Sequence, residues 1–304
     1  MKRLILYVGT ALLLTVSTVW AGPFEDATDA YQRGDYATAF KIIRPLAAQG
    51  DAGAQYNLGA MYLQGHEVPQ DSTEAIKWFH LSAAQGHSWA QNNLGVMYLQ
   101  GHGVPQDSTE AIKWFHLSAA QGHAEAQHSL GAMYLQGHEV LQDFREAVKW
   151  FHLSAAQGHS WAQNNLGVMY LQGHGVPQDS TEAIKWFHLS AAQGHAWAQN
   201  NLGVMHLQGN GVPRDPTESI KWFRLAAAQG NADAQASLGA MYLIGYGVEK
   251  DIVRAYMWFN LGAMSGDRDS VKNRDVVARR MTPAQVTEAQ ALAQECQAQQ
   301  FKGC

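Results

Sequence analysis

The sequence predicts an all-α protein built from about six stacked helix–turn–helix repeats, and a regular spacing of glycine is the first evidence for it. Glycine recurs every 36 residues from Gly50 to Gly266, so residues 51–266 hold six complete repeats. Residues 87–122 and 159–194 are identical at all 36 positions. Two segments of each repeat carry apolar residues at helical spacing. Such short helical pairs bury their apolar faces only by packing against neighbouring pairs, so the repeats are expected to stack.

The overall composition is that of an ordinary folded protein. Of 304 residues, 46% are hydrophobic and 15% are charged, which excludes a disordered chain. The formal net charge of −5 argues against extensive binding to nucleic acid or to anionic lipid. Two cysteines exclude both a disulfide-stapled miniprotein and a cysteine-rich zinc protein.

Residues 1–21 have the layout of a secretory signal peptide. Lys2 and Arg3 precede an apolar run from Leu4 to Val19, and Ala21 offers a small residue for cleavage. The run is shorter than the ~20 residues that span a bilayer comfortably, although an uncleaved membrane anchor is the alternative. We therefore expect a periplasmic or secreted protein with no stable membrane insertion after cleavage.

Residues 22–50 are expected to form an N-terminal capping hairpin. Two helical segments flank a tight turn at Gly34 and Asp35. The terminal repeats of a solenoid need an outer face that differs from the middle, which gives this hairpin its role.

The repeat at residues 87–122 shows how each unit is expected to fold. Its first helix runs from Ser88 to Gln100, and Gly101 ends it because glycine readily adopts positive φ. A loop follows, and Asp107 is a good N-cap for the second helix, with Glu110 three residues later as in a capping box. Tryptophan recurs on the second helices, where we expect it to pack between repeats. These positions are Trp78, Trp114, Trp150, Trp186, Trp222 and Trp258.

Residues 267–304 are expected to form C-terminal capping helices. Residues 267–280 look helical, and Thr282 followed by proline starts a last helix that extends to about Gln299. Cys296 and Cys304 lie eight residues apart, and in an oxidising compartment we favour a disulfide between them. Two free thiols or an intermolecular bridge are the alternatives.

Fourteen histidines raise the question of a metal site. Twelve of them occupy three repeated positions, in the loop, on the second helix and at the junction between repeats. Packed helices lie ~8–10 Å apart, whereas zinc needs its nitrogen ligands at ~2.1 Å around one point. Copies along one ladder therefore cannot share a metal. We interpret these histidines as solvated surface side chains multiplied by duplication, and we expect neither a metal nor a cofactor.

Catalytic motifs are missing from the sequence. It contains no G-x-S-x-G, no G-x-x-x-x-G-K, no S-x-x-K and no G-x-G-x-x-G before a helix. We therefore expect no catalytic residues and no enzyme activity.

The repeated pattern A-x-x-x-L-G-x-x-Y-x-x-G-x-G-V-P-x-D-x-x-x-A-x-x-W-x-x-x-x-A-A-x-G closely resembles the Sel-one-like repeat family, whose members are relatives of tetratricopeptide repeats. Residues 51–266 match it six times. The resemblance implies an α/α superhelical solenoid and a protein-binding or scaffold role without catalysis. Local departures are Leu141 and Glu249 in place of the loop proline, and His206 in place of the tyrosine.

By analogy with tetratricopeptide solenoids, the first helices line the concave surface, and a tryptophan and an asparagine recur on them one turn apart. An asparagine amide offers donors and acceptors that match a peptide backbone, and tryptophan is a favoured hot-spot residue. We expect a partner-binding array here, although tryptophans packed between adjacent repeats are an equally weighted alternative. The array comprises Trp89, Asn92, Val96, Trp161, Asn164, Val168, Trp197, Asn200 and Val204.

These observations favour a periplasmic or secreted scaffold that binds a protein or peptide partner through its concave surface. Nucleic acid is not an expected partner. One alternative is a hydrolase acting on cell-wall or β-lactam compounds, an activity proposed for cysteine-rich relatives. Self-association through the repeat ends is a further alternative.

Overall fold

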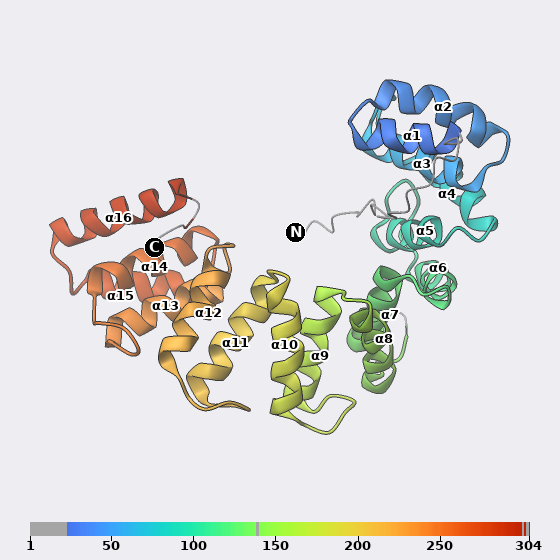
Figure 1. Ribbon diagram of the computed structural model, residues 1–304. Coiled ribbons are helices and arrows are strands. Elements are labelled where there is room, and N and C mark those ends of the chain that lie inside the picture. Colours follow the sequence, from blue (N-terminus) through green and yellow to red (C-terminus); the bar gives the residue numbers. More distant parts are fainter. Residues whose placement is uncertain (1–22, 138–139, 300, 302–303) are drawn as a thin grey trace, which may run out of the picture. The chain divides into compact units, whose positions relative to one another are not determined.

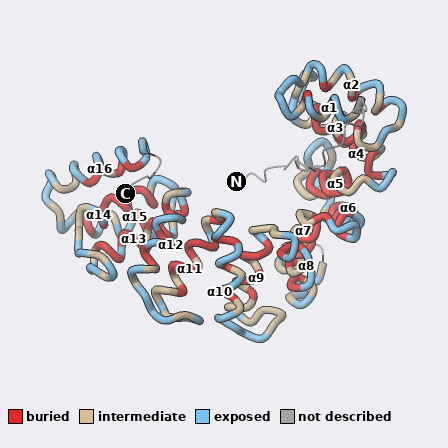
Figure 2. Tube along the Cα trace, viewed as in Figure 1, coloured by how far each residue is buried: buried red, intermediate tan, exposed pale blue. Residues whose placement is uncertain are grey.

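The computed structural model describes residues 23–137, 140–299, 301 and 304, and these residues form sixteen α-helices and no strand. The chain divides into two compact units, residues 1–143 and 144–304. The predicted signal peptide at residues 1–21 lies outside the described residues. Buried positions follow the helix faces that meet neighbouring helices, and the connecting loops are largely exposed (Figure 2). The predicted all-α solenoid of helical hairpins is confirmed.

The N-terminal unit contains seven helices, each packed against the next in sequence (Figure 1). They are α1 (Pro23–Gln32), α2 (Tyr36–Ala48), α3 (Ala52–Gln64), α4 (Ser72–Ala84), α5 (Ser88–Gln100), α6 (Ser108–Ala120) and α7 (Ala124–Gln136). Helix α5 has the bounds that its sequence predicts.

The C-terminal unit contains nine helices in the described part of the chain. They are α8 (Phe144–Ala156), α9 (Ser160–Gln172), α10 (Ser180–Ala192), α11 (Ala196–Gln208), α12 (Pro216–Ala227), α13 (Ala232–Ile244), α14 (Ile252–Met264), α15 (Arg268–Ala278) and α16 (Pro283–Ala298). Successive helices pack in order up to α15, and α16 returns to pack on α14.

Helix ends follow the expected local chemistry. Gly101 adopts a left-handed conformation with φ of 71°, and its N–H donates to the carbonyl of Met97. Asp107 caps α6, with its Oδ1 accepting from the backbone N–H of Glu110 at 2.9 Å. The Glu110 carboxylate pairs with Lys113 Nζ at 2.8 Å. Only one half of the expected capping box is therefore present, the bond to the Asp107 side chain, because the Glu110 carboxylate pairs with Lys113 instead.

A buried phenylalanine fills the centre of each repeat, and in most repeats the neighbouring tryptophan lies at the edge of the core. Phe115 is fully buried over Gly95, and a Cβ at position 95 would lie 2.6 Å from the ring. The neighbouring Trp114 is half-buried and packs from its edge against the core cluster that contains Phe79 of the preceding repeat. The tryptophan at position 114 therefore packs between repeats, and the fully enclosed ring beside it is Phe115. The sixth repeat differs, because Trp258 is also fully buried, with 1% of its surface exposed. The equivalent phenylalanines are Phe79, Phe115, Phe151, Phe187, Phe223 and Phe259.

Buried glutamines tie successive repeats together in the C-terminal unit. Gln199 Nε2 donates to the carbonyl of Ala191 at 3.3 Å, and its Oε1 accepts from Gln229 Nε2 at 2.8 Å. The next glutamine, Gln235, makes the first of these bonds, but its buried Oε1 has no partner. The reason is that Ser265 stands where the preceding repeat has Gln229, and its shorter side chain donates to the carbonyl of Gly262.

Replacing Ser265 with glutamine is expected to stabilise the C-terminal unit by about 1 kcal/mol, because it supplies the missing donor to a buried acceptor. Ser265 has φ and ψ of −81° and 1°, close to the −87° and 5° of Gln193, so the same side-chain geometry is open to it. Urea unfolding of the full chain measures the change. Ser265→Ala is the control, since it removes the hydroxyl without adding a donor. An unfolding free energy that does not rise in Ser265→Gln contradicts the expectation.

Candidate functional site

Two tryptophans stand at the start of first helices in the C-terminal unit with much of their surface open to solvent. Trp161, the second residue of α9, is 46% exposed, and Trp197, the second residue of α11, is 39% exposed. Their copy in the N-terminal unit, Trp89 on α5, is half-buried. Tryptophan is enriched at protein–protein interfaces relative to the rest of the protein surface, so these side chains mark a candidate contact surface.

Two of these tryptophans, Trp161 and Trp89, also contact the following repeat. The Trp161 ring meets the His195 ring edge-on, with centroids 4.5 Å apart and an interplanar angle of 81°. Trp89 meets His123 in the same way at 4.2 Å. One edge of the indole is therefore fixed by the neighbouring repeat while the remainder stays accessible. This preorganises the ring and reduces the entropy that binding would cost.

The three predicted asparagines do not face an open surface, and that prediction is wrong. Asn92, Asn164 and Asn200 are 5%, 8% and 7% exposed. Asn164 Oδ1 accepts a hydrogen bond from Asn201 Nδ2 of the next first helix at 3.1 Å. The position lies between adjacent first helices, so its amide joins repeats and is not available to a partner.

The asparagine contact is incomplete at two places. The buried Oδ1 atoms of Asn92 and Asn200 have no hydrogen-bond partner. Asn201 is the donor to Asn164, but the equivalent donor position holds a serine at both of these places. Ser129 occupies it next to Asn92, and Ser237 occupies it next to Asn200. Ser237 instead donates to the carbonyl of Asp233 on its own helix at 2.8 Å. The shorter side chain thus leaves the asparagine acceptor unmatched.

The predicted valines differ among the repeats. Val96 is buried and belongs to the interior. Val168 and Val204 are half-buried, each lying two helical turns after an exposed tryptophan and packing against the core from its edge. We call Trp161, Val168, Trp197 and Val204 the tryptophan surface. It is formed by α9 and α11, which the Asn201–Asn164 hydrogen bond joins.

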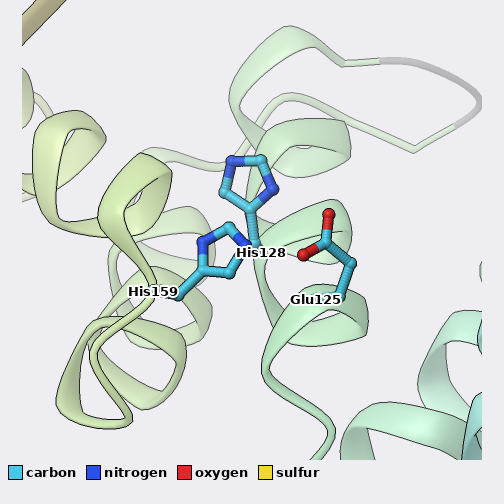
Figure 3. A group of neighbouring side chains, drawn as sticks. All are labelled: Glu125, His128 and His159. Atoms are coloured by element: carbon cyan, nitrogen blue, oxygen red, sulfur yellow. The ribbon is translucent and has the colours of Figure 1, made fainter. Parts of the chain in front are cut away.

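In the third repeat the tryptophan surface is replaced by ionisable side chains. Glu125 occupies the position of Trp161, and His128 occupies the position of Asn164. Both project from α7, while His159 precedes α9 (Figure 3). The apolar array is therefore restricted to particular repeats and is not a uniform property of the ladder.

The junction histidines are helix N-caps, which corrects their interpretation as solvated side chains. His195 Nδ1 accepts from the backbone N–H of Ala198 at 3.3 Å, and His87 accepts from Ala90 in the same way. Burial, and to a smaller extent the nearby His159, lower the pKa of His195 to about 4. The sequence carried a signal for this role, because good N-cap residues fill the same position in other repeats. They are Asp51, Asn231 and Asp267.

The histidines on the second helices are also engaged with neighbouring side chains. His80 Nε2 lies 3.1 Å from Tyr98 Oη, and His152 Nε2 lies 3.2 Å from Tyr170 Oη. Burial lowers the pKa of His80, and the Glu110 carboxylate opposes that change. These rings serve the contact between repeats.

A row of half-exposed leucines on the second helices is a feature that the sequence reasoning missed. Leu153, Leu189 and Leu225 are about 50% exposed in the C-terminal unit. Their 36-residue spacing was visible in the sequence, on the polar side of the helix. Singly exposed apolar side chains are ordinary on protein surfaces, so these leucines serve below as matched controls.

The C-terminal end is held by covalent and apolar contacts. Cys296 and Cys304 form a disulfide with a Cα–Cα distance of 5.8 Å. Cys296 is buried in the same cluster as Trp258 and Leu261 of α14. The last described residues are thereby fastened to the final repeat.

None of the described helices has both the length and the apolar character that crossing a lipid bilayer requires.

Comparisons with known proteins agree with this geometry. The family model for the Sel1 repeat matches residues 52–87, 90–123, 124–159, 162–195, 198–231 and 232–267. A crystal structure of a Sel1 repeat protein from Oxalobacter formigenes is 29% identical, with a TM-score of 0.74, and the match covers 79% of this chain and 96% of that chain. A protective antigen of uropathogenic Escherichia coli that displays an SLR fold is 26% identical, with a TM-score of 0.50 and coverage of 92% and 85%. No curated protein matches the sequence.

Proposed function

Because the chain belongs to the Sel1 repeat family, whose members typically act as non-catalytic scaffolds for protein–protein interaction, we propose that it binds a polypeptide partner through the tryptophan surface of α9 and α11. The observation that carries the proposal is the exposure of Trp161 and Trp197 on neighbouring first helices. The partner would lie across two successive repeats and cover both indoles.

The physical argument rests on apolar area and rigidity. An aromatic side chain buries ~150–250 Å² when a partner covers it completely. Trp161 is already held on one edge by His195, so its rotamer freedom is largely lost before binding. With the asparagine amides enclosed, recognition would depend on apolar contact with partner side chains more than on hydrogen bonds to the partner backbone.

We also propose that the protein works in an oxidising compartment outside the cytoplasm. The signal-like segment at residues 1–21 and the Cys296–Cys304 disulfide both support this location. Cell fractionation with an antibody against the chain tests it, and a chain of full length found only in the cytoplasm with reduced cysteines contradicts it.

Changing either tryptophan to aspartate is expected to weaken partner binding about tenfold or more, in line with hot-spot tryptophans. Aspartate is a tolerated residue at this position, because Asp233 occupies it in the sixth repeat. Twelve-residue peptides selected by phage display against the full chain provide the ligands, and fluorescence anisotropy gives the affinities.

Leu189→Asp and Leu225→Asp are the matched controls, since these leucines are as exposed as the tryptophans but lie on second helices. They are expected to leave the affinity unchanged. Circular dichroism and thermal unfolding verify that every variant is folded. If the leucine variants lose binding while the folded tryptophan variants retain it, the partner uses the other face and the proposal fails.

A further inference from the structure

The junction between the last two repeats holds an open pocket of about 420 Å³ that is separate from the tryptophan surface. It is supplied by α12, α13, α14 and the loop that precedes α14. Its lining residues are Arg224, Tyr242, Val248, Glu249, Lys250, Asp251 and Arg254.

Two guanidinium groups are fixed on one tyrosine in this pocket. Arg224 Nη2 donates to Tyr242 Oη at 2.7 Å, and the Arg254 guanidinium lies over the ring of Tyr242, 5.7 Å from its centroid. Arg254 also pairs with Asp251, with Nε and Oδ2 3.5 Å apart. Arg224 has the neutral tyrosine hydroxyl as its partner, so its positive charge is left uncompensated by any carboxylate contact that the structure shows.

The same positions carry the opposite charge at an earlier junction of this chain. There the tyrosine is Tyr98, and His80 and Glu110 stand in place of the two arginines. His80 Nε2 approaches the hydroxyl of Tyr98 at 3.1 Å, and Glu110 is near enough to His80 to oppose the lowering of its pKa by burial, so the two junctions share one arrangement.

The net charge of the lining therefore reverses along the chain. Two further lining positions differ between the junctions. Lys250 replaces a glutamine of the earlier junction, and Glu249 replaces a proline. The seven equivalent positions hold two carboxylates and no arginine or lysine at the earlier junction. They hold three cations and two carboxylates at the last one, which leaves an excess of one positive charge.

We propose that this pocket binds a carboxylate group of an acidic peptide segment. The planar guanidinium fork pairs with a carboxylate through two parallel hydrogen bonds, which a lysine cannot reproduce. One negative charge neutralises the excess positive charge of the lining, whereas a doubly charged phosphate would exceed it next to Glu249 and Asp251. Val248, which is half-buried at the pocket, offers apolar contact to the methylene groups that carry the carboxylate.

The test titrates the full chain with the peptide acetyl-Ala-Glu-Ala-amide and follows the arginine Nε–Hε signals by NMR. The signals of Arg224 and Arg254, assigned by substitution, are expected to shift with the glutamate peptide. The same peptide with glutamine in place of glutamate, and inorganic phosphate, are the two comparison ligands, and both are expected to bind at least tenfold more weakly.

The decisive variant is Arg224→His combined with Arg254→Glu, which restores the residues that the chain itself carries at its earlier junction. It is expected to fold, as thermal unfolding will verify, and to bind the glutamate peptide at least tenfold more weakly. Lys221→Gln is the charge control, because Lys221 is an exposed cation on α12 that pairs with Glu218 and does not line the pocket. It is expected to keep the wild-type affinity within twofold.

Three outcomes would overturn the assignment: unchanged binding by the folded double variant, equal binding of the glutamine peptide, or phosphate binding as tight as that of the glutamate peptide. The inference does not depend on the proposed function. Trp161→Asp combined with Trp197→Asp is expected to retain binding of the short acidic peptide, and its loss in that variant would place the peptide elsewhere and also contradict the assignment.

Discussion

Replacing Phe187 with alanine is expected to lower the free energy of unfolding of the C-terminal unit by about 3–5 kcal/mol, the usual cost of removing a fully buried phenylalanine. Phe187 is 0% exposed and packs across the repeat against Gly167 on α9. Equilibrium unfolding in urea, together with hydrogen exchange of α9 and α10, measures the loss and shows where it falls.

The same contact predicts that Gly167→Ala lowers the free energy of unfolding when Phe187 is present and raises it when Phe187 is replaced by alanine. In the native chain, a Cβ at position 167 would lie 2.5 Å from Phe187 Cε1, so Gly167→Ala should destabilise by about 1–2 kcal/mol after its gain in helix propensity. When Phe187 is already alanine, the added methyl enters the vacated space and should stabilise by about 1 kcal/mol. Equal effects of Gly167→Ala in both backgrounds would show that the ring and the glycine are not packed together.

Acidification is expected to destabilise the C-terminal unit through the cap of α11. His195 has an ordinary pKa of 6.5 when unfolded and a pKa of about 4 when folded, because burial disfavours its charged form. The unfolded chain therefore binds more protons between these values, so stability is fully present above pH 6.5, falls as the pH drops, and levels off below about pH 4. Since a tenfold change in proton affinity corresponds to about 1.4 kcal/mol, this one residue accounts for up to about 3 kcal/mol.

The mechanism is specific, because the neutral ring accepts a hydrogen bond that the protonated ring cannot. His195 Nδ1 accepts from Ala198 N–H, and a proton on Nδ1 would also place a positive charge at the helix N-terminus. His195→Asn is the matched control, since Asn231 caps α13 with a 2.9 Å bond to Ala234 N–H. Urea unfolding at pH 7, 5.5 and 4.5 should give a flatter pH dependence for His195→Asn. Parallel curves for the two proteins would rule out His195 as the acid-sensitive cap.

Helix positions were predictable from the sequence because local signals mark both ends. Gly101 terminates α5 through a left-handed backbone, and Asp107 caps the helix that follows. Each signal acts within a few residues, so it is readable without knowledge of the packing. The spacing of 36 residues then multiplied one correct hairpin into six.

The sequence alone did not show which of two aromatic side chains fills the core of a repeat, because contacts between helices decide it. Trp114 and Phe115 are adjacent, and both have the size and apolar character of a core residue. The choice is made by Gly95, whose missing side chain leaves space for the ring of Phe115. A single repeat sequence does not specify how the two helices rotate against each other, so this pairing required the structure.

The candidate site was partly predictable for a similar reason. The first helices are contacted on several sides, and residues 90–97 of α5 are all buried. A small change in the rotation of the helix about its axis therefore moves an asparagine from the surface into a junction, whereas Trp161 at the start of its helix stays 46% exposed. The junction histidines were misread because their polarity suggested solvent, although Asp51 and Asn231 at the same repeat position already indicated N-caps.

The most direct test of the central claim is fluorine NMR of the full chain labelled with 5-fluorotryptophan, with and without a selected peptide ligand. Signals of Trp161 and Trp197, assigned by substitution, are expected to shift on binding, while that of Trp222, half-buried on the second helix α12, stays in place. If the Trp222 signal moves and the signals of Trp161 and Trp197 do not, the partner does not bind where the exposed indoles stand, and the account is contradicted.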